Sequence, residues 1–179
     1  MIRMTDAHGD DRRFPPALSD VAGVEFDYGE DGEGVDFEPY GAFDSPERTT
    51  RWLRQWTGNH ELDGGAYRIF GQNGAGGLAA LWCIRAGRPL AEQPVIFMGS
   101  EGERGVVAGC LSDFLWVLAD GYGPLEAALY DAWEATPDAA LAELAARHAT
   151  TPRRPAREII TEARAAFPSF SADLDALCR

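Results

Sequence analysis

The chain has 179 residues and a mass of 19.5 kDa, the size of a single domain with an ordinary hydrophobic core. Because 45% of its residues are hydrophobic and 11% are aromatic, wholesale disorder is excluded. No segment reaches the roughly 18 uncharged apolar residues that a membrane helix needs. Residues 1–13 form a polar, acidic tail without the apolar stretch of a secretory signal. We therefore expect a cytoplasmic protein that makes no contact with a membrane.

Acidic residues outnumber basic ones by 29 to 16, so the formal net charge is −13. The excess is concentrated in residues 1–47, which carry 13 acids and 3 Arg. A field of this sign repels phosphate backbones, so direct nucleic-acid binding is disfavoured. The same field attracts a basic protein and accelerates its encounter. The alternative is an acidic surface that serves only to keep the protein soluble.

The region before residue 45 is rich in Gly, Asp and Glu. Its segment 35–40 alternates apolar and polar residues and predicts an edge strand, limited by Pro39. A turn-prone acidic loop precedes this strand. Three carboxylates of the loop are candidate contacts for a protein partner: Glu30, Asp31 and Glu33.

A helix is predicted to begin at Ser45 and to end at 57–59. Ser45 is a good N-cap, Pro46 suits the first helical position, and Glu47 lies near the positive end of the helix dipole. The apolar stripe of this helix consists of three residues: Trp52, Leu53 and Trp56. Its Arg residues lie on the other side, where they either face solvent or bind a ligand.

Residues 66–109 predict a meander of strands at 66–70, 78–84, 94–99 and 106–109. These segments are almost uninterruptedly apolar. One face of the sheet should therefore pack on the core, and the other should be at least partly covered. The glycine-rich segment between the first two strands predicts a hairpin turn, with a positive φ at Asn73, Gly74 or Gly76. Four residues are assigned to this turn for structural reasons: Gly71, Asn73, Gly74 and Gly76.

After residue 110 the apolar residues follow helical spacing. Ser112 and Asp113 are predicted caps of the first helix, and Asp138 is a predicted cap of a later one. Further helices are predicted from Pro124 and over 155–166 and 170–177. The pattern predicts an α+β fold whose mainly antiparallel sheet has flanking helices. We expect one domain over 14–179, with its core at about 45–120 and a helical extension over 121–179.

No combination of residues points to catalysis, a metal or a cofactor. Cys83, Cys110 and Cys178 are widely spaced, which argues against a disulfide framework or a zinc site. The three His residues lie in three different segments. One alternative remains, a small nucleotide-binding enzyme. It follows from a G-x-G-x-x-A match at Gly74, Gly76 and Ala79, which requires a helix after the turn to hold a pyrophosphate. The segment 78–84 predicts a strand at least as well as a helix.

Several of these features occur in an order that resembles the SMI1/KNR4 (SUKH) superfamily. They are the helix before the sheet, the FG-x-x-G-x-G turn at 70–76, the strand LAALW, the segment PVIFMGSEGERGVVA and the helix LSDFLWVLADG. The resemblance extends from about Trp52 to Leu118 and implies an α+β domain with a central, mainly antiparallel sheet. Many bacterial members of this superfamily are immunity proteins that bind and neutralise a secreted toxin, often a nuclease or a deaminase. Such proteins need no catalytic residues and no cofactor.

The resemblance and the lack of a catalytic constellation together predict a non-enzymatic protein-binding module of the toxin-immunity type. An acidic surface suits a basic toxin, since carboxylates can occupy the places of substrate phosphates. Candidate contacts are the acidic stretch 27–38 and a second group of carboxylates: Asp63, Glu101 and Glu103. An alternative within the same fold is a regulatory scaffold that binds a partner or a second copy through its helical tail, 136–177.

Overall fold

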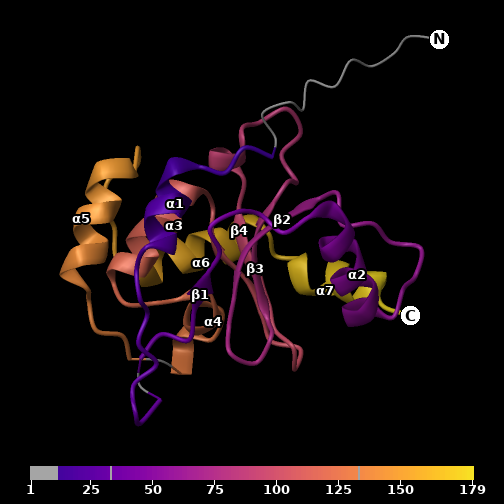
Figure 1. Cartoon of the computed structure of the whole chain (residues 1–179), viewed down its shortest axis with the longest axis horizontal. Helices are drawn as coiled ribbons and strands as arrows, with labels where there is room; N and C mark the ends of the chain where they lie inside the picture. The colour runs from indigo at the N-terminus through magenta and orange to yellow at the C-terminus, as the bar shows by residue number, and fades with distance from the viewer. Residues whose placement is uncertain (1–11, 33, 133) are drawn as a thin grey trace.

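An antiparallel sheet of five strands forms the centre of the molecule (Figure 1). It is seen in a computed structural model that describes residues 12–32, 34–132 and 134–179. The strands lie side by side in their order along the chain, each antiparallel to its neighbour. They are β1 (Glu38–Pro39), β2 (Tyr67–Gln72), β3 (Leu78–Trp82), β4 (Val95–Met98) and β5 (Arg104–Ala108). The predicted α+β class is confirmed. The edge strand predicted over 35–40 is present but is only two residues long, Glu38–Pro39.

Helices surround the sheet. The α-helices are α1 (Pro16–Ala22), α2 (Pro46–Thr57), α3 (Leu111–Ala119), α4 (Pro124–Ala128), α5 (Ala139–His148), α6 (Ala156–Ala166) and α7 (Phe170–Leu177). Two short 3₁₀ helices are η1 (Leu90–Glu92) and η2 (Tyr130–Ala132). Within the described ranges, none of these helices has the length and apolar character needed to cross a membrane. Helix α1 was not predicted, because seven residues are too few to show helical periodicity.

Both faces of the sheet are buried, as the apolar strands predicted. Along β4, Val95 and Phe97 belong to one hydrophobic cluster, whereas Ile96 and Met98 belong to the other. The first cluster joins the sheet to α1, α3, α4, α5 and the start of α6. The second joins it to α2, α7 and the end of α6. Figure 1 shows this arrangement, with α1, α3 and α5 on the left of the sheet and α2 and α7 on the right.

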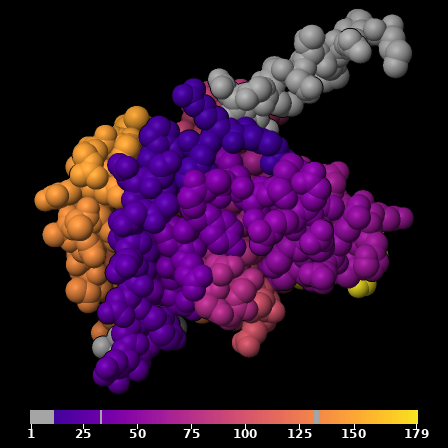
Figure 2. Space-filling model, in the orientation of Figure 1, coloured from indigo at the N-terminus to yellow at the C-terminus, as the bar shows by residue number. Residues whose placement is uncertain are grey.

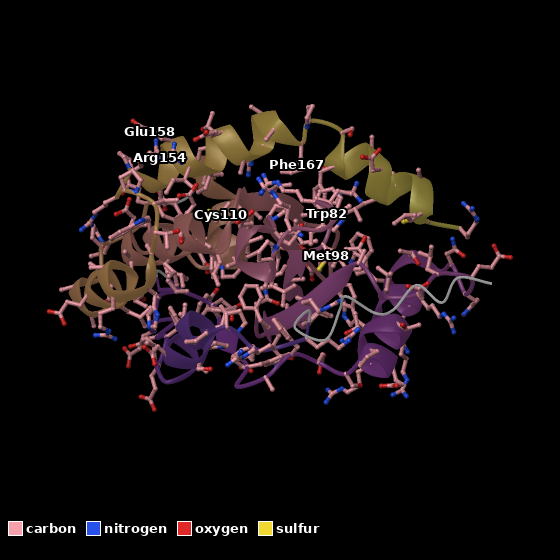
Figure 3. All side chains as sticks on the ribbon, turned by 90° about the horizontal axis from the view of Figure 1, so that it is seen from above. Trp82, Met98, Cys110, Arg154, Glu158 and Phe167 are labelled. Atoms are coloured by element: carbon pink, nitrogen blue, oxygen red, sulfur yellow. The ribbon has the colours of Figure 1, made fainter. Side chains whose placement is uncertain are left out.

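The helices at the C-terminal end belong to the body of the fold. Figure 3 shows α6 and α7 (yellow) one after the other along one side of the molecule, with Phe167 at their junction. The Trp82 ring of β3 lies 5.4 Å from the Phe167 ring and 5.1 Å from the Phe170 ring, measured between centroids. Ile159, Ile160 and other apolar residues of these helices are buried against the sheet. The apolar faces of the predicted tail therefore pack within this molecule, which leaves little for the scaffold alternative to use.

The predicted N-cap residues are confirmed for two of three helices. Ser45 Oγ accepts a hydrogen bond from the Arg48 N–H at 3.2 Å, and Asp138 Oδ1 accepts one from the Leu141 N–H at 3.0 Å. The predicted capping of α3 by Ser112 and Asp113 is wrong. The N-cap residue of α3 is Cys110, with no side-chain capping bond among the described residues. Ser112 and Asp113 lie inside the helix, where their side chains bind the segment after α5 instead.

The glycine-rich turn joins β2 to β3 as predicted, although Gly71, which was assigned to the turn, lies within β2 and pairs with Pro39 and Ala79. The Gly76 N–H donates to the Asn73 carbonyl at 3.0 Å, and the Gly77 N–H donates to Asn73 Oδ1 at 2.7 Å. Only Gly76 has a positive φ, of 88°; Asn73 and Gly74 do not. Ala79 lies in strand β3. The helix that the nucleotide-enzyme alternative requires after this turn is replaced by a strand, so that alternative loses its geometric basis.

A matched pair of substitutions tests this turn. We expect Gly76→Ala to lower the free energy of unfolding by about 1–2 kcal/mol, because a Cβ is strained at this φ although the space around it is open. Gly74→Ala is the control, since Gly74 lies outside the left-handed region and its added Cβ would meet only Asp36 Oδ1, at 3.3 Å. Urea unfolding monitored by Trp fluorescence measures both. Equal stability of the two variants would contradict this assignment of the turn.

A truncation tests whether the C-terminal helices belong to the core. A chain ending at residue 135 loses the cover of α6 and α7 over one sheet face, and we expect it to lose the cooperative thermal transition of the full chain. Circular dichroism and calorimetry measure this transition. A truncated chain that melts cooperatively near the melting temperature of the full chain would show that the tail is an independent appendage.

Candidate protein-interaction surface

The acidic loop (residues 25–38) lies on the surface between α1 and the sheet. Seven of its fourteen residues are Asp or Glu, and none is basic. Figure 2 shows the N-terminal segment, coloured indigo to purple, spread over one face of the molecule beside the orange C-terminal helices. In Figure 1 the loop descends below the helices and returns to β1. This is the largest concentration of acidic residues on a single surface segment.

The backbone of the acidic loop is held in a defined turn. The Gly34 N–H donates to the Tyr28 carbonyl at 2.8 Å, and the Val35 N–H donates to the Asp27 carbonyl at 3.0 Å. Asp27 Oδ1 accepts the Gly29 N–H at 2.7 Å. These bonds connect the descending and returning arms of the loop. A loop ordered before binding loses less conformational entropy when a partner arrives.

The carboxylates of the loop face solvent. The described acids at its outer part are exposed: Glu25, Asp27, Glu30 and Asp31. Among the residues that the structure describes, no Arg or His forms an ion pair with any of them. Glu33 lies outside the described residues. The side chain of Tyr28 is 53% exposed and lies beside Gly32 at the same turn. The loop therefore presents free negative charge around a single aromatic ring.

Seven described acids outside the loop form ion pairs with Arg. Ion pairs in the described ranges join Arg48 to Asp44, Arg88 to Glu92, Arg104 to Asp175, Arg147 to Asp20, Arg153 to Asp120 and Arg154 to both Asp113 and Glu162. His148 Nε2 lies 2.6 Å from Asp20 Oδ2, and this hydrogen bond lowers the pKa of Asp20. Unpaired carboxylates also occur elsewhere in the described ranges, for example at Asp63, Glu143 and Glu158, so the acidic loop is distinguished by the density of its exposed acids.

Buried contacts anchor the base of the loop. Phe26 and Phe37 pack edge to face with ring centroids 5.2 Å apart. The Asp36 N–H donates to Glu126 Oε1 at 2.8 Å, and Glu126 is only 1% exposed. Asp36 Oδ1 in turn accepts the Gly74 N–H at 2.8 Å, which connects the loop to the β2–β3 turn. The loop is thus attached to both α4 and the sheet.

The second predicted group of carboxylates does not come together. Asp63 is exposed on the loop after α2, beside Thr50, whose Oγ1 accepts the Gly64 N–H at 2.9 Å. Glu101 and Glu103 lie in the β4–β5 turn, where Glu103 Oε2 accepts the Glu101 N–H at 3.2 Å. Trp56 is the side chain of α2 that reaches this turn, by donating to the Gly99 carbonyl at 2.7 Å. Thr50 and Trp56 are six positions apart, so they project from different sides of the helix. Asp63 therefore lies apart from Glu101 and Glu103.

Sequence reasoning missed two residues of this surface. Tyr28 is the aromatic residue of an acidic turn, and its exposure was not predicted. An aromatic residue between Asp27 and Gly29 is nevertheless a pattern that could have indicated an exposed ring in a turn. Glu126 was not singled out by any sequence pattern. It is buried at the start of α4, where Gly123 lies close to Val35 and Glu126 accepts the Asp36 N–H. The hydrogen bond between Asp36 and Glu126 joins residues 90 positions apart, which no local pattern encodes.

Comparison with known proteins gives no relative. No family model, no curated protein and no solved structure matches this chain. The function must therefore be inferred from the surface itself. Over the described part of the chain, no group of three or more His, Cys, Asp or Glu is arranged to hold a metal ion.

The buried carboxyl of Glu126 should make the stability of the protein depend on pH. Burial raises the pKa of Glu126 above its ordinary value of 4.5, and its Oε2 has no hydrogen-bond partner among the described residues. Above pH 4.5 the folded state keeps a proton that the unfolded state releases, so this group lowers stability as pH rises through that window. Glu126→Gln keeps an oxygen for the Asp36 N–H and removes the titration.

We therefore expect the stability of Glu126→Gln, relative to the wild type, to increase as pH rises from 4.5 and then to level off. Urea unfolding at a series of pH values between 4 and 8 measures the difference. The same substitution at an exposed site, Glu143→Gln, serves as the control. A pH-independent difference for Glu126→Gln would refute the role of burial.

Proposed function

We propose that this protein is a non-catalytic binding module of the SMI1/KNR4 immunity type. It binds a basic toxin domain of the nuclease or deaminase class through its acidic loop and thereby blocks the toxin. The single observation that carries the proposal is a preordered surface loop with several exposed, unpaired carboxylates around the half-exposed ring of Tyr28.

The chemistry of the loop fits such a partner. An enzyme that acts on nucleic acids presents Arg and Lys side chains to bind phosphates. Carboxylates held at the end of a rigid loop can pair with those cations and exclude the substrate. Complementary charge also accelerates association and disfavours acidic competitors. Because these charges are exposed, the gain in rate should weaken as ionic strength rises.

Tyr28 provides the apolar part of the contact. Interface energy is concentrated in a few residues, among which Tyr is enriched, and a ring of polar contacts usually surrounds them. Tyr28 lies between Asp27 and Glu30 in sequence and is the most exposed large hydrophobic residue among the described ones. The acidic loop thus combines an aromatic anchor with flanking charge on one ordered segment.

Recovery of the partner from the native host tests the proposal. The tagged full-length chain is used as bait, captured proteins are identified by mass spectrometry, and the captured toxin domain is purified for inhibition assays. We expect a basic domain that the wild type inhibits at a one-to-one ratio. If no basic toxin domain is captured, the proposal fails.

Charge reversal identifies the surface. We expect Glu30→Arg with Asp31→Arg to weaken the affinity at least tenfold, since each close charge pair contributes more than about 1 kcal/mol. Tyr28→Ala should weaken it by a similar factor. The matched control is Glu143→Arg with Glu158→Arg, which changes the net charge equally at exposed sites on α5 and α6. Equal affinity of the loop variant and the control, measured by titration calorimetry, would contradict the assignment of this surface.

A further inference from the structure

Helix α2 carries basic residues that the acidic loop does not explain. Arg48, Arg51 and Arg54 follow one another at every third position along its outer side. Arg48 pairs with Asp44 at 3.5 Å. Arg51 and Arg54 have no carboxylate within ion-pair distance among the described residues. In a chain with a net charge of −13, two uncompensated Arg side chains one turn apart are unusual.

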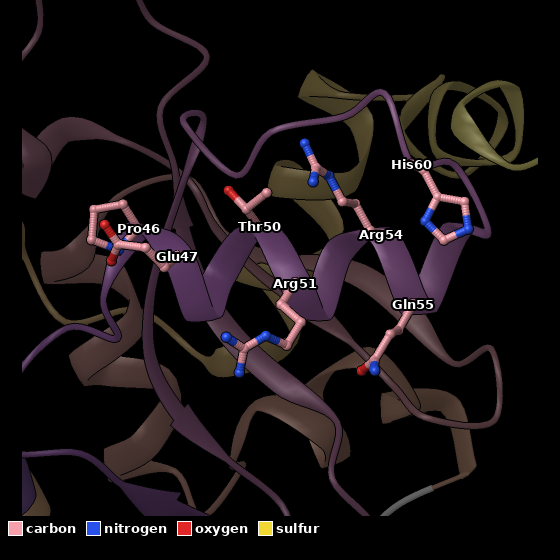
Figure 4. A pocket seen from close by; sticks show the side chains of 7 residues that line it. All are labelled: Pro46, Glu47, Thr50, Arg51, Arg54, Gln55 and His60. Atoms are coloured by element: carbon pink, nitrogen blue, oxygen red, sulfur yellow. The ribbon is translucent and has the colours of Figure 1, made fainter.

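These side chains border two adjoining hollows. The first has a volume of about 640 Å³ and is lined by Pro46, Glu47, Thr50, Arg51, Arg54, Gln55 and His60 (Figure 4). The second, of about 240 Å³, lies between α2, β1 and the β2–β3 turn. Arg51 and Gln55 line both hollows and form the ridge between them. The first volume falls within the range of about 300–1,000 Å³ that is common for small-molecule sites.

The first hollow has the chemistry of an anion site. Figure 4 shows Arg54, Gln55 and His60 toward one end of the helix, Pro46 and Glu47 toward the other, and Arg51 between them. Arg54 is positioned by its Nε–H, which donates to the Leu62 carbonyl at 2.7 Å and leaves its terminal nitrogens for a ligand. The planar guanidinium groups of Arg51 and Arg54 suit phosphate oxygens. Glu47 lines the same hollow at the opposite end from His60. In Figure 4 the side chains of Arg51 and Arg54 extend to opposite sides of the helix, with Arg51 toward the Glu47 end.

The second hollow has the chemistry of a site for a planar ring. Its lining includes Trp52 and Tyr40, two half-buried aromatic residues. Trp52 stacks on Trp56, with centroids 5.8 Å apart and an interplanar angle of 17°. The Tyr40 hydroxyl donates to Gln72 Oε1 at 2.8 Å. Rigid aromatic faces bind nucleobases by stacking, and the nearby amides of Gln55 and Gln72 can hydrogen-bond to a base edge.

From these two hollows we infer a mononucleotide-binding site on the outer side of α2, with the phosphates at Arg51 and Arg54 and the base against Trp52 and Tyr40. The size of the hollows favours one nucleotide over a strand, because the second measures only about 240 Å³ and is bordered by Gly76 of the β2–β3 turn and Leu78 of β3. This site requires no helix after that turn and no catalytic residue. It lies on a different element from the acidic loop, so ligand and protein partner can bind together.

Titration calorimetry and Trp fluorescence test this site in the full chain. The probes are ATP, GTP, CTP, AMP, inorganic pyrophosphate and a ten-residue oligodeoxythymidine. We expect at least one nucleotide to bind and to change Trp fluorescence. The affinity for pyrophosphate should be at least tenfold lower than the affinity for that nucleotide. The inference is overturned if no nucleotide binds at millimolar concentration. It is also overturned if pyrophosphate binds as well as the nucleotides, or if the oligonucleotide binds more tightly per site than every mononucleotide.

Substitutions locate the two parts of the site. Arg51→Gln should weaken nucleotide binding at least tenfold, and folding should be unaffected because no contact of this side chain is lost. Trp52→Leu should lower the affinity for nucleotides at least fivefold and change the affinity for pyrophosphate by less than twofold. A thermal melt first confirms that this variant folds. The control is Arg88→Gln, an exposed Arg in the loop between β3 and β4, which should bind like the wild type. Unchanged nucleotide binding in Arg51→Gln would refute the site.

Discussion

Burial of the central sheet on both faces is the constraint on which the rest of the molecule depends. Successive side chains along its strands belong alternately to two hydrophobic clusters, one on each face of the sheet. Each cluster needs its own layer of helices. The helices after β5 are therefore required to complete the sheet. Function must then reside on the surfaces that the sheet and its two helix layers leave exposed, namely the connecting loops and the outer sides of the helices.

The uncovered surface is divided by charge. Seven described acids outside the acidic loop are matched by Arg side chains, whereas the loop concentrates exposed carboxylates without ionic partners among the described residues. The outer side of α2 shows the opposite excess on a smaller scale. Buried neighbours of Asp36 and Phe37 hold the acidic loop in place, so its charge is presented from a defined position. A fixed concentration of charge of this kind can select a partner as well as attract it.

Local patterns predicted most of the architecture. The alternation at 35–40, the Ser45 cap, the glycine-rich turn and the continuous apolar strands each encode a short-range preference, and all agree with the structure. Helix α1 was missed because its apolar residues span fewer than two turns. The capping of α3 was misassigned because Ser112 and Asp113 bind residues about 40 positions away. Neither the burial of Glu126 nor the separation of Asp63 from Glu101 could be deduced, since both depend on contacts between distant segments.

Hydrogen exchange of the whole chain, free and bound to its basic partner, tests the central claim about the acidic loop most directly. In the free protein the amides of Gly34 and Val35 should already exchange slowly, because both donate hydrogen bonds across the loop. In the complex, new protection should be concentrated in residues 25–38. Rapid exchange of these two amides in the free protein, or new protection confined to α2 or to α5–α7, would contradict the account.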